Sequence, residues 1–175
     1  MKKIILLLLV VSSCSRVTEP GWKVVWSDEF NYTGLSDTAK WVNEVGFIRN
    51  RELQYYTERR IENSVVAGGN LLLIGRQEEY DTARYTSASI TTDGRYSWTY
   101  GKIEARMKLP KGKGMWPAFW MLGQNIHQVG WPRCGEIDIM EHINEEDILY
   151  GNLHWHNERH VSTGNSVPCT VGEFH

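Results

Sequence analysis

Three carboxylates crowd into residues 135–141 (GEIDIME): Glu136, Asp138 and Glu141. In an extended strand, residues two apart share a face, so Glu136 and Asp138 point together while the isoleucines between them face the opposite side, toward a core. Glu141 lies three positions further on and would point among those apolar side chains, where a carboxylate is costly to bury. A β-bulge of one extra residue, most simply at Met140, restores the parity. The pattern therefore predicts a bulged strand with all three acids on one face.

This spacing suits the hydrolysis of glycosidic bonds. With one residue absorbed, the two glutamates are four steps apart, or about 13 Å between Cα atoms, a gap that two side chains leaning together largely span. Their carboxyl groups would approach the ~5 to 5.5 Å of a retaining glycosidase, closer than the ~6.5 to 9.5 Å of an inverting one. Asp138 could share a proton with the nucleophile and help keep the glutamates in different protonation states. Alternating acids also describe a merely solvated face, so the pattern alone does not decide.

Aromatic side chains surround the acids in sequence: Trp116, Phe119, Trp120 and Trp131 precede them and Trp155 follows. Apolar ring faces suit the C–H faces of sugars, which favours a saccharide cleft. Alternation puts Trp116 and Trp120 on one face. Trp116 and Trp131 are the preferred sugar platforms, because each is followed by proline and so by a loop or strand edge. The alternative is that these tryptophans belong to the core.

The elements that must position these residues read as strands. Residues 100–109 alternate most clearly, with apolar side chains on one face and charged ones on the other. Residues 64–67 and 71–75 flank the turn 68–70 (GGN), a hairpin signal. Further short strands are expected at 23–26, 88–92, 118–122, 136–141 and 149–156. Many short strands separated by glycine-rich turns indicate a sandwich or jelly roll.

Composition bounds the class of protein. The chain has 175 residues, 41% of them hydrophobic, so one domain with a real core is expected. The formal net charge is −2, which disfavours a nucleic-acid partner.

The first residues read as an export signal. Lys2 and Lys3 precede the apolar run 4–11 and then a Ser-Ser-Cys sequence, and the run is far shorter than the ~20 residues of a membrane span. Residues 11–14 resemble a bacterial lipobox, in which Cys14 would be lipidated; simple cleavage is the alternative. The expected organisation is a signal peptide with lipobox at 1–14, a short tether at 15–21 and a catalytic domain at 22–175.

The remaining cysteines are Cys134 and Cys169. An even pair in an oxidising compartment could form a disulfide, and two free thiols are the alternative. His154 and His156 lie two apart on an expected strand, with His160 and Cys169 downstream, which makes a zinc cluster conceivable, but no established zinc spacing is present.

Several blocks together carry a family resemblance. Residues 112–122 (GKGMWPAFWML) and 135–141 resemble glycoside hydrolase family 16, in its bulged, laminarinase-like branch. Residues 26–30 (WSDEF), 50–57 (NRELQYYT) and 100–110 (YGKIEARMKLP) extend the match in the family's order across most of residues 22–160.

The resemblance implies an endo-acting, retaining hydrolase of β-1,3-glucan, with an all-β, concanavalin-like jelly-roll β-sandwich. It makes Glu136 the nucleophile, Asp138 its helper and Glu141 the general acid/base. The matching positions that would bind substrate in the cleft are Asn50, Arg51, Trp116, Trp120, Trp131 and His154. Asn50 and Arg51 could equally be turn residues that make local hydrogen bonds.

The resemblance also bears on cofactors, partners and extent. No cofactor is expected for catalysis, although a structural calcium could lie near Glu29, as in many members. The expected partner is a polysaccharide bound by a monomer, with membrane contact only through an N-terminal lipid. The protein is expected at the cell surface or outer membrane as a lipoprotein, or otherwise in the periplasm or secreted. Residues 172–175 resemble the opening of a strand that in the family runs on, so the chain is expected to be truncated at its C-terminus and the fragment itself could be inactive.

Other functions stay open within and outside this family. Agarase, porphyranase or carrageenase activity on β-galactans, transglycosylation, and a non-catalytic glucan-binding module are the alternatives. The three retained acids favour an enzyme, and the block at 50–57 favours a laminarinase.

Overall fold

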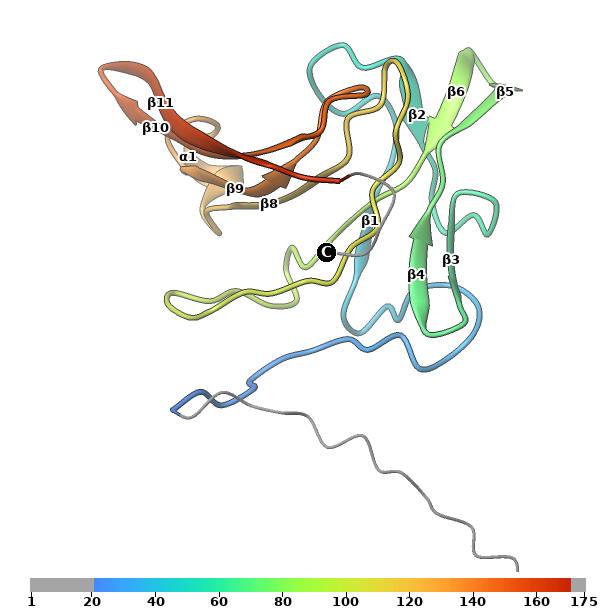
Figure 1. Cartoon of the computed structure of the whole chain (residues 1–175), viewed down its shortest axis with the longest axis horizontal. Helices are drawn as coiled ribbons and strands as arrows, with labels where there is room; N and C mark the ends of the chain where they lie inside the picture. Colours follow the sequence, from blue (N-terminus) through green and yellow to red (C-terminus); the bar gives the residue numbers. More distant parts are fainter. Residues whose placement is uncertain (1–20, 171–175) are drawn as a thin grey trace, which may run out of the picture. The chain divides into compact units, whose positions relative to one another are not determined.

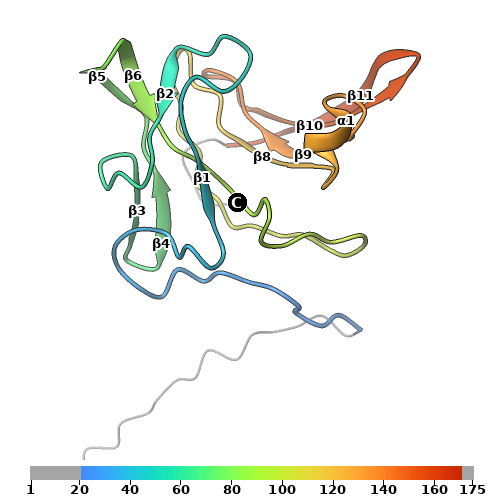
Figure 2. The same cartoon turned by 180° about the vertical axis from the view of Figure 1, so that it is seen from behind.

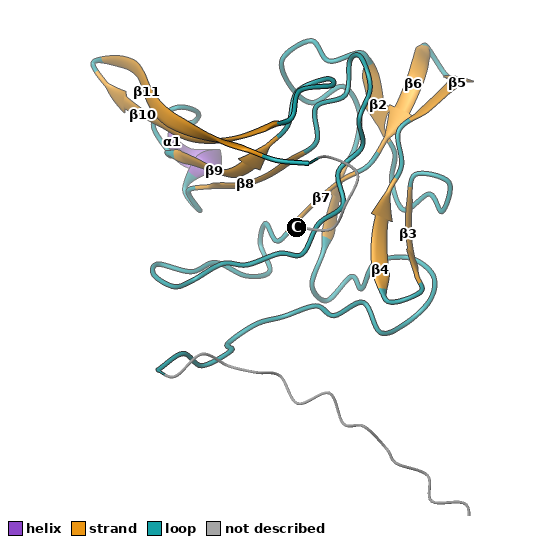
Figure 3. Cartoon of the chain, viewed as in Figure 1, coloured by secondary structure: helices purple, strands orange, loops and turns teal. Residues whose placement is uncertain are grey.

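The computed structural model describes residues 21–170, and this part of the chain is almost entirely strand and loop (Figure 3). It contains eleven strands and one helix of four residues, α1 (Ile126–Val129). The signal segment 1–14, Cys14 and nearly all of the tether lie outside the described residues, so those predictions stay untested. No helix within residues 21–170 has the length and apolar character needed to cross a membrane.

The described chain divides into two compact units. The first comprises residues 21–36 and 44–89, and the second comprises residues 37–43 and 90–170. Two short strands, β1 (Val42–Glu44) and β7 (Ser89–Thr91), form a two-stranded sheet of their own.

The first unit contains the predicted hairpin. Strand β3 (Ser64–Ala67) pairs antiparallel with β4 (Asn70–Leu73), and Ala67 lies opposite Asn70. The turn therefore consists of Gly68 and Gly69, with φ of 58° and 75°. Both values lie in the left-handed region that a two-residue hairpin turn with matching twist requires and that glycine enters without strain. The predicted hairpin is confirmed, but its turn is one residue shorter than 68–70 and its second strand covers 70–73 and not 71–75.

A three-stranded sheet completes the first unit, in the order β2 (Gln54–Tyr56), β6 (Ala83–Ser87), β5 (Arg76–Tyr80). A fully buried asparagine, Asn63, lies behind it: its amide nitrogen donates to Ile74 O and Thr86 Oγ1, and its carbonyl oxygen accepts from Thr57 Oγ1. Arg60 also donates to that oxygen and forms an ion pair with Glu78. This unit is thus stabilised by a satisfied polar network beside apolar residues such as Val66.

The second unit contains an antiparallel sheet with the order β11-β10-β9-β8 (Figures 1 and 2). Its strands are β8 (Ala118–Leu122), β9 (Glu136–Glu141), β10 (Ile148–Asn157) and β11 (Arg159–Pro168). The predictions at 118–122 and 136–141 are confirmed to the residue. Strand β11 was not expected, because its sequence is mostly polar; it forms because it pairs along its whole length with β10.

Two predicted strands are absent. The structure assigns no strand to residues 23–26 or 100–109, although the latter has the clearest alternation in the sequence. Lys102 and Glu104 do lie on one side and form an ion pair of 3.0 Å, as in an extended backbone. The alternation in residues 100–109 therefore predicts an extended segment with an apolar and a charged side. A β-strand also needs a neighbouring strand to which it can hydrogen-bond, and the alternation of side chains does not provide one.

The burial expected opposite the acids is only partly present. Met140 is buried, but Ile137 is 47% exposed, so the prediction that it enters the core is wrong. Leu153, opposite Ile137 on β10, is 45% exposed. Parity assigns a side chain to one face of a sheet, whereas the covering of that face depends on elements from elsewhere in the chain.

Candidate active site

The bulge predicted from the acid spacing is present in β9. Against β8, Met140 pairs with Phe119 and Asp138 pairs with Trp120, so Ile139 is the extra residue. Against β10, Glu141 pairs with Tyr150 and Asp138 with Asn152, where two steps on β10 match three on β9. The insertion thus lies one position earlier on the β8 side than the predicted Met140, with the same effect on parity.

The bulge brings the three acids to one face of the sheet. Glu136, Asp138 and Glu141 lie opposite Leu122, Trp120 and Ala118, which alternate along β8 and so share a face. The two glutamates are four residues apart when counted on β8, or about 13 Å between Cα atoms. This is the arrangement that the sequence predicted, with Asp138 between the glutamates.

Asp138 is the most buried of the three acids, with an exposed fraction of 6%. Its Oδ2 accepts no hydrogen bond among the described residues, although His154 Nε2 lies 3.1 Å away. Burial, followed by the negative charges of Glu136 and Glu141, raises the pKa of Asp138 to about 6, and His154 partly opposes this shift. Asp138 therefore exchanges a proton near neutral pH, next to a candidate nucleophile.

Glu141 is held by donors from both sides. Trp116 Nε1 donates to its Oε1 at 2.8 Å, and Asn152 Nδ2 on β10 donates to its Oε2 at 2.7 Å. The bulge makes the second contact possible, because it brings Glu141 back onto the face that carries Asn152. The sequence assigned Trp116 only a sugar-stacking role; its side chain is also 56% exposed, so the ring remains open to solvent.

His154 joins the acids to an aromatic cluster. It lies opposite Glu136 on β10, with its Nε2 4.0 Å from Glu136 Oε1. Its Nδ1 lies 2.9 Å from Nε2 of His160 on β11. The ring of Trp131 lies 6.2 Å from that of His154 and 4.6 Å from that of His160. The structure thus brings three predicted residues, His154, Trp131 and Glu136, into one neighbourhood.

The other predicted substrate-binding residues are placed as follows. Trp120 lies opposite Asp138 on the acid face. Asn50 and Arg51 belong to the first unit, where both are exposed with φ of 54° and form the centre of a turn closed by Glu52 N–H donating to Arg49 O at 3.1 Å. That geometry agrees with the turn alternative, and their role toward substrate stays a prediction.

One group of ligating side chains within metal-binding distance occurs among residues 21–170: Glu136, Asp138 and His154, whose ligating atoms lie within 4.8 Å of one another. It coincides with the candidate catalytic acids, whose proton exchange accounts for the cluster. It does not include Glu29, and the structural calcium suggested by the resemblance stays a prediction.

The possible disulfide is absent, because Cys134 and Cys169 are not bonded to each other. Cys134 precedes β9 near the Glu136–His154 pair, whereas Cys169 follows the Ile148–Pro168 pair. Six residues of β10 separate these pairs, or about 20 Å, far beyond the ~7 Å limit between Cα atoms of a disulfide. The same separation keeps Cys169 away from the histidines of the conceivable zinc cluster.

Comparison with known proteins identifies the family. Residues 49–171 match the model described as an XgeA-like, catalytic GH16 domain. The whole chain is 44% identical to a β-glucanase of Rhodothermus marinus, and 82% of it is 40% identical to a glucan endo-1,3-β-glucosidase of Cryptopygus antarcticus. The structure superposes on the laminarinase of Rhodothermus marinus with a TM-score of 0.81 and 45% identity over 88% of the chain. The chain belongs to glycoside hydrolase family 16.

Membership of family 16 confirms the predicted jelly-roll fold class. The chain spans 67% of the Rhodothermus β-glucanase, 56% of the Cryptopygus glucosidase and 65% of the laminarinase chain.

Two residues of this family 16 site were not assigned to it from the sequence, in which His160 was only a conceivable zinc ligand. Asn152 shares the parity of His154 on β10, so strand alternation alone could have placed it on the acid face. His160 gave no such signal, because its position beside His154 depends on the turn at Glu158 and the β10–β11 register.

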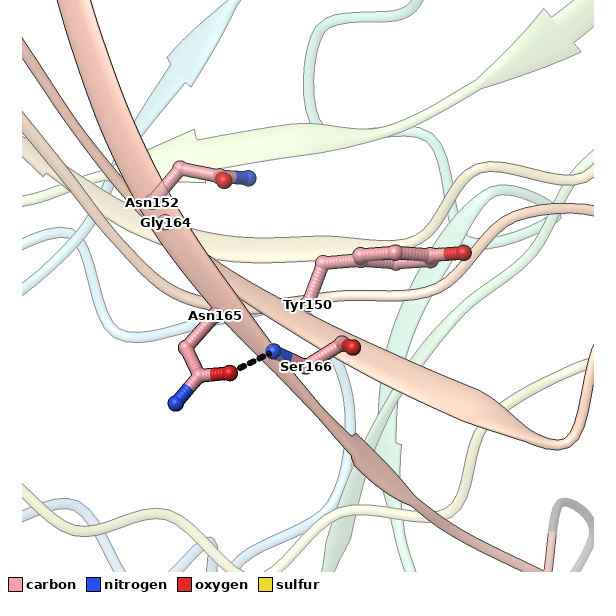
Figure 4. A pocket seen from close by; sticks show the side chains of 5 residues that line it. All are labelled: Tyr150, Asn152, Gly164, Asn165 and Ser166. Atoms are coloured by element: carbon pink, nitrogen blue, oxygen red, sulfur yellow. Dashed lines mark hydrogen bonds between the residues drawn. The ribbon is translucent and has the colours of Figure 1, made fainter.

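A hollow of about 350 Å³ borders Asn152, whose amide donates to Glu141. Its lining comes from β10 and β11: Tyr150, Asn152, Gly164, Asn165 and Ser166 (Figure 4). Tyr150 lies opposite Glu141, so the hollow adjoins the acid face. Its polar lining is suited to hydroxyl-rich ligands.

Proposed function

We propose that the protein is a retaining endo-hydrolase of β-1,3-glucan. The observation that carries the proposal is the bulged strand, which aims three acids at one face, with the central one buried and its pKa raised to about 6. This geometry meets the requirement of a retaining glycosidase for two carboxyl groups with different tasks.

The reaction proceeds in two steps. A carboxylate oxygen of Glu136 forms a bond to the anomeric carbon while the glycosidic C–O bond breaks, and Glu141 gives its proton to the departing oxygen. Glu141, now ionised, then takes a proton from water, whose oxygen attacks the anomeric carbon and releases Glu136. Two inversions at one carbon give net retention.

Asp138 has a part in both steps. Burial raises the pKa of Asp138 to about 6, so its neutral form persists to a higher pH than that of an ordinary aspartic acid, and in that form it can donate a hydrogen bond to the carboxylate of Glu136 beside it. When the glycosyl–enzyme bond forms, Glu136 loses its negative charge and Asp138 can ionise with less repulsion, its proton passing to His154 Nε2, which lies 3.1 Å from Asp138 Oδ2. Asp138 therefore helps to balance charge as the covalent intermediate forms and breaks.

The choice of β-1,3-glucan is supported by relatives named as a laminarinase and a glucan endo-1,3-β-glucosidase. The exposed rings of Trp116 and Trp131, 56% and 49% exposed, lie beside the acid cluster and could stack on glucose units. Trp120, His154, Asn50 and Arg51 complete the proposed substrate-binding set.

The test is digestion of laminarin, lichenan, agarose and carrageenan by the chain and its variants. We expect internal cleavage of laminarin with the β-anomer appearing first by NMR, and losses of at least about a thousandfold in kcat for Glu136→Gln and Glu141→Gln. Glu145→Gln, at an exposed position just after β9, is the matched control and should retain activity.

Other outcomes would contradict the proposal. Laminarin binding without cleavage would indicate a glucan-binding module, cleavage of agarose or carrageenan alone would indicate a β-galactan hydrolase, and longer glucans as main products would indicate a transglycosylase. Near-normal cleavage by either glutamine variant would remove the assigned residue from the mechanism.

We also propose that the protein is an exported monomer anchored through a lipid on Cys14. A signal-like start and residues 11–14 support this. The Cys14→Ala variant should lose incorporation of labelled palmitate and leave the membrane fraction, and unchanged labelling would contradict the anchor.

A further inference from the structure

We propose that Asn152 is a positioning residue for the carboxyl group of Glu141, and that Gly164 keeps Asn152 in the required place. The inference deepens the proposed function and rests on it, because it takes Glu141 as the general acid/base.

The first step is the two-sided hold on Glu141. Asn152 Nδ2 donates to Oε2 at 2.7 Å and Trp116 Nε1 donates to Oε1 at 2.8 Å. Hydrogen bonds to a charged carboxylate are among the stronger ones in proteins. Rotation of the carboxyl group about its last side-chain bond would break both, so the two donors together fix its plane.

The second step is how Asn152 reaches this position. On β10 it lies opposite Asp138, while Tyr150 lies opposite Glu141, so its amide reaches diagonally along the face. Diagonal neighbours are about 7 to 8 Å apart at their Cα atoms, a span that an asparagine and a glutamate side chain can bridge. Without the bulge, Glu141 would point to the other face and the contact could not form.

The third step concerns Gly164, which lies opposite Asn152 on β11. A Cβ at this position would lie 2.0 Å from Asn152 Oδ1 and 2.8 Å from Gly151 O. Gly164 is not among the residues with positive φ, so its backbone does not require glycine. Glycine is needed there for space, and any side chain would push the amide of Asn152 away from Glu141.

The catalytic consequence follows from the task of Glu141. A general acid must present its proton within hydrogen-bond reach of the departing oxygen, and a displacement of about 1 Å can cost about a hundredfold in rate. A freely rotating carboxyl group would meet that condition less often. The Asn152 contact should therefore matter for substrates that need protonation and much less for those that do not.

The experiment compares two substrates in the chain and in Asn152→Ala. Laminarin has a poor leaving group that needs the proton of Glu141, whereas 2,4-dinitrophenyl β-laminaribioside releases a stable phenolate without it. We expect kcat on laminarin to fall about 10- to 100-fold, and the burst of dinitrophenolate that reports glycosyl–enzyme formation to change less than about threefold. Azide, which needs no general base, should restore turnover of the aryl substrate.

Asn157→Ala is the matched control. Asn157 is an exposed asparagine at the end of the same strand as Asn152, opposite Arg159 and outside the lining of the hollow. This variant should keep both rates. Equal losses on the two substrates in Asn152→Ala, or no loss on laminarin, would overturn the positioning role.

A second pair of variants tests Gly164. Gly164→Ala leaves Asn152 chemically intact but should reproduce the selective loss on laminarin. Added to Asn152→Ala it should lower kcat on laminarin little further, because the clash with Oδ1 is gone; the remaining close contact with Gly151 O should appear as a loss of stability in urea unfolding. Fully additive losses would overturn the role of Gly164. No release of dinitrophenolate and no cleavage of laminarin by the unmodified chain would instead refute the proposed function itself.

Discussion

The raised pKa of Asp138 predicts that an acid essential for activity destabilises the fold at neutral pH. The pKa is raised from 3.8 to about 6, first by burial and then by Glu136 and Glu141. The native state therefore holds this proton more tightly than the unfolded chain. The resulting contribution to the free energy of unfolding is fully present below about pH 3.8 and is lost as the pH rises through about 6.

The magnitude follows from the shift of about two units. At about 1.36 kcal/mol per unit, ionising Asp138 in the native state at pH 7.5 costs up to about 3 kcal/mol. Asn mimics the neutral acid in shape, so Asp138→Asn should raise the free energy of unfolding by about 1 to 3 kcal/mol at pH 7.5 and change it little at pH 4. The same variant should lose about tenfold or more in activity, because an amide cannot exchange the proton.

The assay is urea unfolding of both proteins at pH 4, 6 and 7.5. Asp147→Asn serves as the control of opposite sign, because a hydrogen bond from Lys111 lowers the pKa of Asp147. That variant should not be stabilised at any of these pH values. If Asp138→Asn is no more stable at pH 7.5, or if its advantage is as large at pH 4, the burial argument is refuted.

Three further predictions concern the first unit. Arg60 lowers the pKa of Glu78 to about 2, so the stability that ionised Glu78 provides is present above about pH 4.5 and is lost as the pH falls toward 2. In Glu78→Gln the urea concentration at the unfolding midpoint should therefore depend less on pH between about 4.5 and 2. An unchanged pH dependence would contradict this. Gly68→Ala should lower the free energy of unfolding by about 1 kcal/mol, measured by thermal melting. An added Cβ would meet no atom within 4 Å, so the cost comes only from the backbone φ of 58°, and Gly68→Asn should cost less because asparagine enters this region more readily. Asn63→Ala should cost about 2 to 4 kcal/mol in urea unfolding, since it removes the buried hydrogen bonds of Asn63 with Thr57 Oγ1, Thr86 Oγ1 and Ile74 O; a loss under 1 kcal/mol would show that the network is dispensable.

The sequence alone determined those features in which neighbouring residues constrain one another. The parity conflict among Glu136, Asp138 and Glu141 predicted the bulge, because a carboxylate facing an apolar interior is too costly to leave there. The two glycines at 68 and 69 predicted their hairpin, because their backbone freedom suits the turn.

Only the tertiary structure decided which distant residues meet. The pairing of β9, β10 and β11 brings Asn152 to Glu141 and Gly164 to Asn152. The position of the bulge at Ile139 follows from the pairing of β9 with β8. The absent strand at 100–109 and the exposure of Ile137 have the same cause. The local pattern of a chain determines the face of the sheet to which each side chain points. Which residues of other strands meet it on that face depends on the long-range register, which no local pattern encodes.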